Sequence, residues 1–301
     1  MCRAETGSEA TSTSDEALTR SRERARTPDV SVVVPVYNKA KYLEACLDSV
    51  LSQQGVSVEA ICIDDASTDA SGSILRRYKT LGETVTVLTN TTRRGVAYSR
   101  NRGIEQAQGV WIQFTDGDDV LPAGSLAALV AAARRENADV VRGSLNRLRG
   151  GSVEPWPTAT IGAEHHGTLL DLPEVWIPWF HTCYVIARDL LLQRGVRYPD
   201  LIAGEDPVFL ADVLTSARRI CVVPTVAYLY RQDEPRAAPT RRTLEDYLRH
   251  AEMVRSVYAE RCQPCWDKYH PFVQDDLRLL LSQTALSPDE RAQFEALIAR
   301  L

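Results

Sequence analysis

Several features are scarce in this 301-residue sequence, and their scarcity excludes whole classes of protein. Glycine and proline number 16 and 15, which is too few for a collagen-like or low-complexity chain. The formal net charge of −5 is too small for attraction to nucleic acid or to an anionic membrane to be the main function. With 44% hydrophobic residues, a chain of this length can bury a sizeable core, as a globular protein does.

Long hydrophobic segments are missing as well. No apolar run approaches the roughly 18 residues that would span a bilayer. The N-terminus lacks the apolar stretch of about 7–15 residues that marks a signal peptide. We therefore expect a cytoplasmic protein, which could also bind peripherally at the inner face of the cell membrane.

The seven cysteines are an odd number and show no metal-binding pattern. Cys46 and Cys62 lie within apolar patterns, where a free cysteine behaves as a small hydrophobic residue, and this favours a reducing compartment. Cys262 and Cys265 form one CxxC motif, without the second CxxC or the histidine pair that a zinc site needs. We interpret this motif as a turn of a helix.

The first 28 residues differ in composition from the rest. Nine of them are serine or threonine, five are acidic and five are basic, so the segment buries too little to offset its ordering entropy. We predict that residues 1–28 form a disordered tail. A basic group within it could contact anionic lipid, but a solvated tail is the simpler interpretation; its members are Arg20, Arg22, Arg24 and Arg26.

From Asp29 onward, strand and helix patterns alternate. Short apolar runs predict strands at 30–35, 58–63, 85–88, 111–115 and 139–142. Helical spacing of apolar residues predicts helices at 42–51, 74–78, 96–107 and 126–133. Strands alternating with helices need crossover connections, so we predict an α/β fold with a mostly parallel, Rossmann-like sheet flanked by helices.

The pattern changes after residue 150. Residues 150–167 are predicted to form a long loop, a helix is expected to open at Gly204, and a last strand is expected at 220–230. Helical spacing then continues from Thr243 to the end. We divide the chain into a tail at 1–28, an α/β domain at 29–238 with halves at 29–145 and 146–238, and a helical C-terminal extension at 239–301.

Acidic residues follow the predicted strands. Asp116, Asp118 and Asp119 come directly after the fourth strand, where their charges would repel one another unless a cation lay among them. Carboxylates are ligands that Mg²⁺ and Mn²⁺ prefer, although an isolated DxD is often only a solvated acidic turn. Its position favours the metal, because ligands of parallel sheets gather at the carboxyl ends of the strands.

Two further acidic pairs have two interpretations each. Asp64 and Asp65 follow the second strand, where one could cap the next helix or accept the imide N–H of a uracil ring. Glu205 and Asp206 open a predicted helix, where a carboxylate could act as a general base or could simply favour the helix dipole. A carboxylate at this position could serve as a general base and also interact favourably with the helix dipole.

Cationic and imidazole side chains are candidates for substrate contacts. Arginine offers paired donors for a diphosphate, although each arginine could equally be a solvated surface group. The arginine candidates are Arg93, Arg94 and Arg100. Histidine could serve an acceptor pocket, but a buried or surface histidine without such a role is the alternative. The histidine candidates are His165, His166 and His181.

Four stretches resemble the inverting family 2 glycosyltransferases of the GT-A fold. They are VSVVVPVYNKAKYLEACLDSVLSQ, ICIDDASTDAS, NTTRRGVAYSRNRGIEQAQGVWIQFTDGDD and GEDPVFLADVLTSARRICVVPTVAYLYR, at residues 30–53, 61–71, 90–119 and 204–231. The chain departs from the family at Trp179–Cys183, where many relatives carry a Trp-Asn-Lys-Leu-like segment, so acceptor contacts cannot be carried over. The helical tail matches no motif.

The resemblance implies a role for each candidate residue. Pro35, Tyr37 and Asp65 would surround the nucleobase, usually uracil, and Asp206 would be the base with Glu205 as its neighbour. Asp116 and Asp118 would be the DxD pair near the ribose and a Mn²⁺ or Mg²⁺ cofactor, with Asp119 close by. The full set expected to bind the nucleotide-sugar is Pro35, Tyr37, Asn38, Asp64, Asp65, Arg93, Arg94, Arg100 and Asp116.

The activity implied is transfer of a sugar from a UDP-sugar to a hydroxyl acceptor, with inversion at the anomeric carbon. The enzyme would be a hexosyl- or N-acetylhexosaminyl-transferase, and its acceptor a surface or capsular polysaccharide, a glycolipid or a cell-wall precursor. Residues 29–145 would bind the donor and 146–238 the acceptor. The alternatives are a non-catalytic nucleotide-sugar-binding module and a metal-dependent phosphoryl-transfer enzyme, although one phosphatase type would carry DxD after its first strand.

Overall fold

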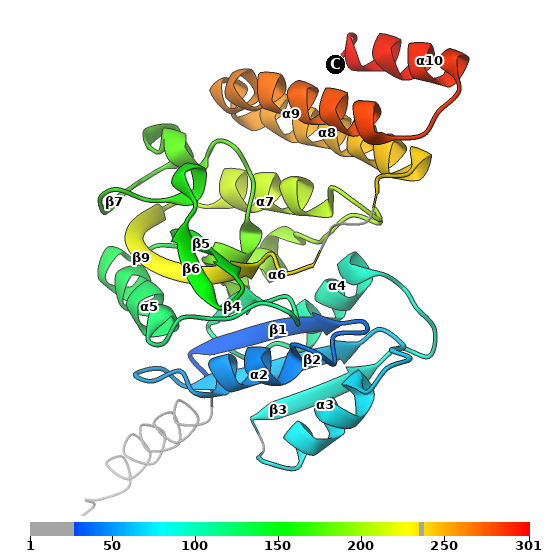
Figure 1. Cartoon of the computed structure of the whole chain (residues 1–301). Coiled ribbons are helices and arrows are strands. Elements are labelled where there is room, and N and C mark those ends of the chain that lie inside the picture. Colours follow the sequence, from blue (N-terminus) through cyan, green and yellow to red (C-terminus); the bar gives the residue numbers. More distant parts are fainter. Residues whose placement is uncertain (1–26, 83, 235–237) are drawn as a thin grey trace, which may run out of the picture.

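The computed structural model describes residues 27–82, 84–234 and 238–301 (Figure 1). The described residues form a nine-stranded sheet in the order β3-β2-β1-β4-β8-β5-β9-β7, with β6 paired to β5 beside this path. The strands are β1 (Val30–Val36), β2 (Val58–Asp64), β3 (Val85–Thr89), β4 (Trp111–Phe114), β5 (Val140–Arg149), β6 (Ser152–Pro155), β7 (His165–Gly167), β8 (Tyr184–Ala187) and β9 (Ile220–Arg231).

The N-terminal half of the sheet is parallel, as predicted. Every residue of β1 is buried, because the strand lies between β2 and β4 with helices on its faces. The register pairs Val36 with Asp64 and Val33 with Phe114. The strands therefore reach the same edge of the sheet, and the polar residues after β1, β2 and β4 emerge together.

Helices follow the strands in the predicted alternation. Since the crossovers are right-handed, α2 and α3 cover one face of the parallel strands and α4, which crosses back from β3 to β4, covers the other. The remaining helices pack around the second half of the sheet and above it (Figure 1). The helices are α2 (Leu43–Leu51), α3 (Ser71–Lys79), α4 (Val96–Gln106), α5 (Ser125–Glu136), α6 (Arg188–Arg194), α7 (Glu205–Ser216), α8 (Arg241–Arg261), α9 (Gln263–Gln283) and α10 (Pro288–Ile298).

The prediction of one long loop at 150–167 is wrong. Strand β6 pairs with β5, and β7 pairs antiparallel with β9. Strand β8, which the patterns also missed, runs antiparallel between β4 and β5. These three strands have only three or four residues each, too few to show a periodicity, and the sheet is consequently mixed beyond β4.

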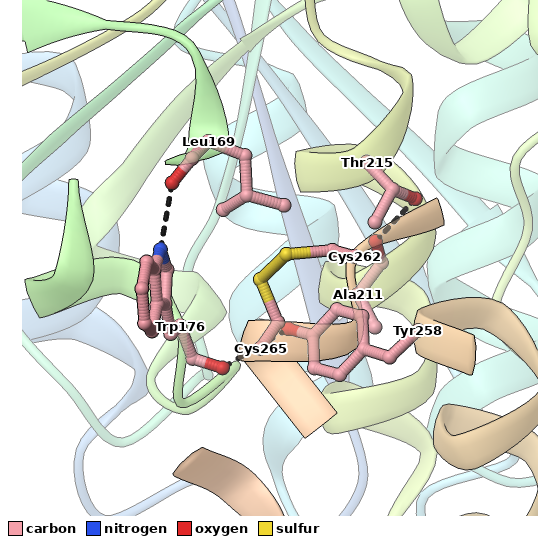
Figure 2. The surroundings of a disulfide bond; sticks show 7 residues. All are labelled: Leu169, Trp176, Ala211, Thr215, Tyr258, Cys262 and Cys265. Carbon is pink, nitrogen blue, oxygen red and sulfur yellow. Dashed lines mark hydrogen bonds between the residues drawn. A yellow bond between two sulfur atoms is a disulfide. The ribbon is translucent and has the colours of Figure 1, made fainter. Parts of the chain in front are cut away.

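The interpretation of Cys262 and Cys265 as a turn within one helix is also wrong. Helix α8 ends before Cys262, whose backbone is not helical, and α9 restarts with Pro264 in its first turn, where proline fits well. The two cysteines form a disulfide at this break. Figure 2 shows it near Trp176, whose carbonyl oxygen accepts a hydrogen bond from the Tyr258 hydroxyl (3.2 Å), so the extension is anchored to the α/β core here.

The predicted disorder of the tail falls mainly on residues outside the described ranges, as do the four arginines of its basic group. Pro28 is attached to the α/β core, because its carbonyl oxygen accepts a hydrogen bond from the Val110 amide (3.1 Å). In the described ranges, no helix combines the length and the hydrophobicity needed to cross a membrane. The division of the chain into three regions stays a prediction.

The close approach of α4 to β1 gives a stability test. A Cβ at Gly103 would lie 2.2 Å from Val33 Cγ1, so Gly103→Ala should lower the free energy of unfolding by about 1–3 kcal/mol. Urea denaturation measures this. Gly162→Ala is the control, because a Cβ there meets nothing within 4 Å. The packing account is contradicted if Gly103→Ala costs as much in a Val33→Ala background, where the obstructing methyl groups are gone.

Candidate active site

A cavity of about 850 Å³ opens where the ends of β1 and β4 meet the first turns of α4 and α7, a volume typical of small-molecule sites. It brings together residues from all three acidic groups. The candidates lining it are Pro35, Tyr37, Asp65, Arg93, Arg94, Arg100, Asp116, Asp118, Asp119, Glu205 and Asp206. Asn38 and Asp64 do not line the cavity.

Asn38 and Asp64 build the turns beneath the cavity rim. Asn38 adopts a left-handed conformation (φ 52°), and its Oδ1 accepts a hydrogen bond from the Thr68 amide (2.8 Å). Asp64 Oδ1 accepts from the Ser67 amide (2.9 Å). This hydrogen bond closes a turn before α3, whose N-cap is Ala70 without a side-chain cap hydrogen bond, so Asp64 does not cap the helix.

Asp65 instead organises the loop that carries two arginines. Its buried carboxylate accepts hydrogen bonds from Asn90 Nδ2 (2.6 Å) and from the backbone amides of Arg94 and Gly95 (both 2.8 Å). The Arg93 guanidinium lies over the Tyr37 ring, with Cζ 4.1 Å from the ring centroid. One carboxylate thus sets the shape of the rim at the β2 end.

Arg100 connects the acidic groups at the centre of the site. Its side chain is only 3% exposed, and its Nη2 lies 2.9 Å from Asp116. Its Nη1 contacts Glu205 (2.8 Å) and Asp206 (2.7 Å). A single buried cation therefore holds the turn after β4 against the start of α7, and both of its Nη atoms are directed at protein carboxyl groups.

The two carboxyl groups of the α7 terminus differ in charge state. Burial and the neighbouring Asp206 charge raise the pKa of Glu205 to about 8, despite Arg100. Burial works against ionisation of Asp206 too, but the Arg100 charge and the contact with His181 outweigh it and hold its pKa well below the ordinary value. At neutral pH Glu205 is protonated and Asp206 is an ionised proton acceptor at the cavity, a division of roles that environments commonly impose on paired carboxyls.

Of the three candidate histidines, one belongs to this site. His181 is buried, and its Nδ1 lies 3.0 Å from Asp206 Oδ2. The short 3₁₀ helix His181–Cys183 places it there, after Phe180 in a left-handed conformation (φ 60°). His165 and His166 lie on β7, pair with glutamates and do not line the cavity.

The DxD turn is held from two sides. Asp118 forms an ion pair with Lys39. Asp119 is 2% exposed, and its two oxygens accept hydrogen bonds from the Tyr228 hydroxyl (2.6 Å) and the Arg231 amide (2.7 Å). Burial and the charges of its two acidic neighbours raise the pKa of Asp119 to about 8.

A preformed metal cage is not part of this turn. Over residues 27–82, 84–234 and 238–301, no three histidine, cysteine, aspartate or glutamate side chains are grouped to hold a metal ion. Asp116 and Asp118 nevertheless face the cavity, each with 31% of its side chain exposed. Two such carboxylates suit Mg²⁺ or Mn²⁺ that takes its other ligands from water and from substrate phosphates.

Sequence reasoning missed several lining residues, which are Lys39, Asp200, Tyr230, Arg231 and Arg242. Arg231 could have been found, because it directly follows the strand predicted at 220–230, and Lys39 lies in the loop after the first predicted strand. The contribution of α8 could not, since it depends on packing. Asp246 accepts a hydrogen bond from the Ile202 amide (2.9 Å), so α8 supports the loop that leads into α7.

Comparisons with known proteins find relatives of this chain. A family model described as "Glycosyl transferase family 2" matches residues 31–191, a little over half of the chain. The chain is 24% identical to the uncharacterized glycosyltransferase EpsJ of Bacillus subtilis, over 91% of this chain and 83% of EpsJ. It is 31% identical to a poly(ribitol-phosphate) beta-glucosyltransferase of Bacillus spizizenii, over 67% of this chain and 32% of that protein.

A solved structure shares the fold. The structure of S. aureus TarS 1–349 in complex with UDP-GlcNAc matches with a TM-score of 0.66 at 20% identity, covering 90% of this chain and 88% of that one. The expected GT-A type of fold, with a helical C-terminal region, is thereby confirmed.

The raised pKa of Glu205 gives a pH-dependent stability test. Between about pH 5 and 8 the folded state keeps a proton that the unfolded state loses, so this residue makes the free energy of unfolding fall as pH rises. Glu205→Gln removes the effect. Relative to wild type, this variant should gain about 2–3 kcal/mol between pH 6 and 8.5 in urea denaturation. A constant difference across that range would contradict the account.

Proposed function

Because the chain belongs to glycosyl transferase family 2, we propose that it transfers a sugar from a UDP-sugar to an acceptor hydroxyl, with inversion at the anomeric carbon. The observation that carries this proposal is the pair of contacts made by Arg100, which set the DxD turn and the Glu205–Asp206 pair in one cavity. A donor diphosphate and an acceptor hydroxyl need these two groups side by side.

We assign the donor to the β1–β4 side of the cavity. Pro35, Tyr37 and Asp65 would surround the uracil, and Arg93 and Arg94 would supply donors to the diphosphate. Asn38 and Asp64 would support these groups from below through their turns. The structural likeness to a protein solved with UDP-GlcNAc supports this choice of donor.

Asp116 and Asp118 are the residues that would hold a divalent metal. Bound there, Mn²⁺ or Mg²⁺ would offset the charge that develops on the departing diphosphate. Our assignment leaves out Asp119, because both of its carboxylate oxygens already accept hydrogen bonds from β9. Arg100 would act by positioning carboxylates rather than by gripping phosphate, since its guanidinium is buried among them.

Asp206 is the proposed general base. It would take the proton of the acceptor hydroxyl while that oxygen bonds to the anomeric carbon and the bond to the UDP oxygen breaks. A single displacement without an enzyme nucleophile gives inversion. Arg100 and His181 would hold the carboxylate ionised and oriented, and protonated Glu205 keeps a second negative charge away from it.

For the acceptor and the transferred sugar we propose chemical classes rather than single compounds. One relative is named a poly(ribitol-phosphate) beta-glucosyltransferase, which supports a hydroxyl-rich cell-surface polymer or its precursor as acceptor and a hexose or N-acetylhexosamine as the sugar. We propose that the reaction takes place in the cytoplasm, where the protein could also bind peripherally at the membrane. The buried free thiols of Cys46, Cys62, Cys183 and Cys221 support that compartment, whereas the Cys262–Cys265 disulfide is more typical of an oxidising one.

The proposal predicts UDP release from a UDP-sugar, measured over a panel of nucleotide sugars with Mn²⁺ and with Mg²⁺. Asp206→Asn removes the base and should lower the turnover of the donor by about 10²–10⁴-fold. Its affinity for UDP in calorimetry should stay within about threefold of wild type, because the base lies on the acceptor side.

Asp212→Asn, on the same helix and paired with Arg261 instead, is the matched control and should keep full turnover. Near wild-type turnover by Asp206→Asn would refute the assignment of Asp206 as the general base. If wild type binds UDP but turns over no UDP-sugar, the non-catalytic binding module becomes the better account. The phosphatase type that carries DxD after its first strand is disfavoured, since the DxD follows β4 rather than β1.

A further inference from the structure

Lys39 lines the cavity, and its backbone is fixed by hydrogen bonds. Its amide donates a hydrogen bond to Ser71 Oγ (2.8 Å), and the next amide, that of Ala40, donates to Asp69 Oδ2 (3.0 Å). The preceding Asn38 is tied to the same turn through the Thr68 amide (2.8 Å). The backbone that carries Lys39 is therefore fixed to the start of α3.

The side chain of Lys39 lies across the DxD turn. Its ammonium forms an ion pair with Asp118 Oδ2, and both side chains line the cavity with about a third of their surface exposed (34% and 31%). A Cβ added to Gly117 would lie 3.4 Å from Lys39 Cγ, so the stem of the lysine runs along the turn. The Lys39 ammonium is thus paired with Asp118, one of the two carboxylates that face the cavity.

Two other cations of the cavity, Arg100 and Arg231, are paired with protein groups around the DxD turn. Arg100 is buried and shared by three carboxylates. The Arg231 Nε donates to the Asp118 carbonyl oxygen (2.7 Å), and its Nη1 pairs with Asp233 (2.9 Å). Lys39 instead has a flexible four-carbon stem and three donors, and a diphosphate entering the cavity would lie within its reach.

We propose that Lys39 is a specificity-determining residue that makes donor binding less dependent on metal: it neutralises Asp118 in the free protein and contacts the donor diphosphate in the complex. This inference rests on the proposed nucleotide-sugar site. Since like charges repel, an ammonium at Asp118 should weaken metal binding there, whereas the same charge should strengthen the binding of a diphosphate. These two effects have opposite signs.

The test measures UDP affinity by calorimetry, first in EDTA and then against Mn²⁺ concentration. Lys39→Met should weaken UDP binding without metal by about tenfold, the worth of a charge-assisted hydrogen bond. The same variant should lower, by several-fold, the Mn²⁺ concentration that gives half of the metal's effect on UDP affinity. Lys39→Arg should retain the metal-free affinity of wild type.

Lys41→Met is the matched control, because Lys41 lies on the same loop but pairs with Glu234 and is 68% exposed. It should change neither quantity by more than about twofold. Unchanged metal-free affinity in Lys39→Met would overturn the inference, and so would an unchanged or higher Mn²⁺ requirement. Failure of wild type to bind UDP with or without Mn²⁺ would instead overturn the proposed function, and this inference with it.

Discussion

The site depends on one buried interaction, the contact of the Arg100 guanidinium with three carboxyl groups. Asp116 belongs to the end of β4, whereas Glu205 and Asp206 begin a helix about ninety residues later. Burying a charge is costly unless it is paired and hydrogen-bonded, and here both Nη atoms of Arg100 contact carboxyl oxygens. The same contact therefore stabilises the junction of the two halves of the sheet and sets the charge state of the candidate base.

The rest of the fold supports that contact. The parallel register of β1, β2 and β4 brings their polar ends to one edge, and α4 carries Arg100 beneath it. Helix α8 holds the loop before α7, and His181 approaches Asp206 from the segment after β7. The C-terminal helices, which matched no motif, thus contribute to the geometry of the site without supplying its proposed base.

Patterns in the sequence predict the strands and helices that form this site better than the side-chain contacts between them. The buried run of β1, the acids after β4 and the pair opening α7 are local signals, and all lie where strand and helix periodicity put them. The pairing of Lys39 with Asp118 and of His181 with Asp206 joins residues far apart in the chain, and no local pattern encodes it. The helix break at Cys262 was missed because apolar spacing continues on both sides of it.

A double-mutant cycle on Arg100 and Asp206 tests the central claim most directly. Arg100→Met removes the cation that compensates Asp116 and Asp206 and should lower the free energy of unfolding by about 2–4 kcal/mol, less than for a fully buried pair because both side chains are partly exposed. If charge compensation is the reason, Asp206→Asn should recover stability in that background, with a coupling of about 1–3 kcal/mol between the two sites. Losses that simply add, to within about 0.5 kcal/mol, would contradict the account.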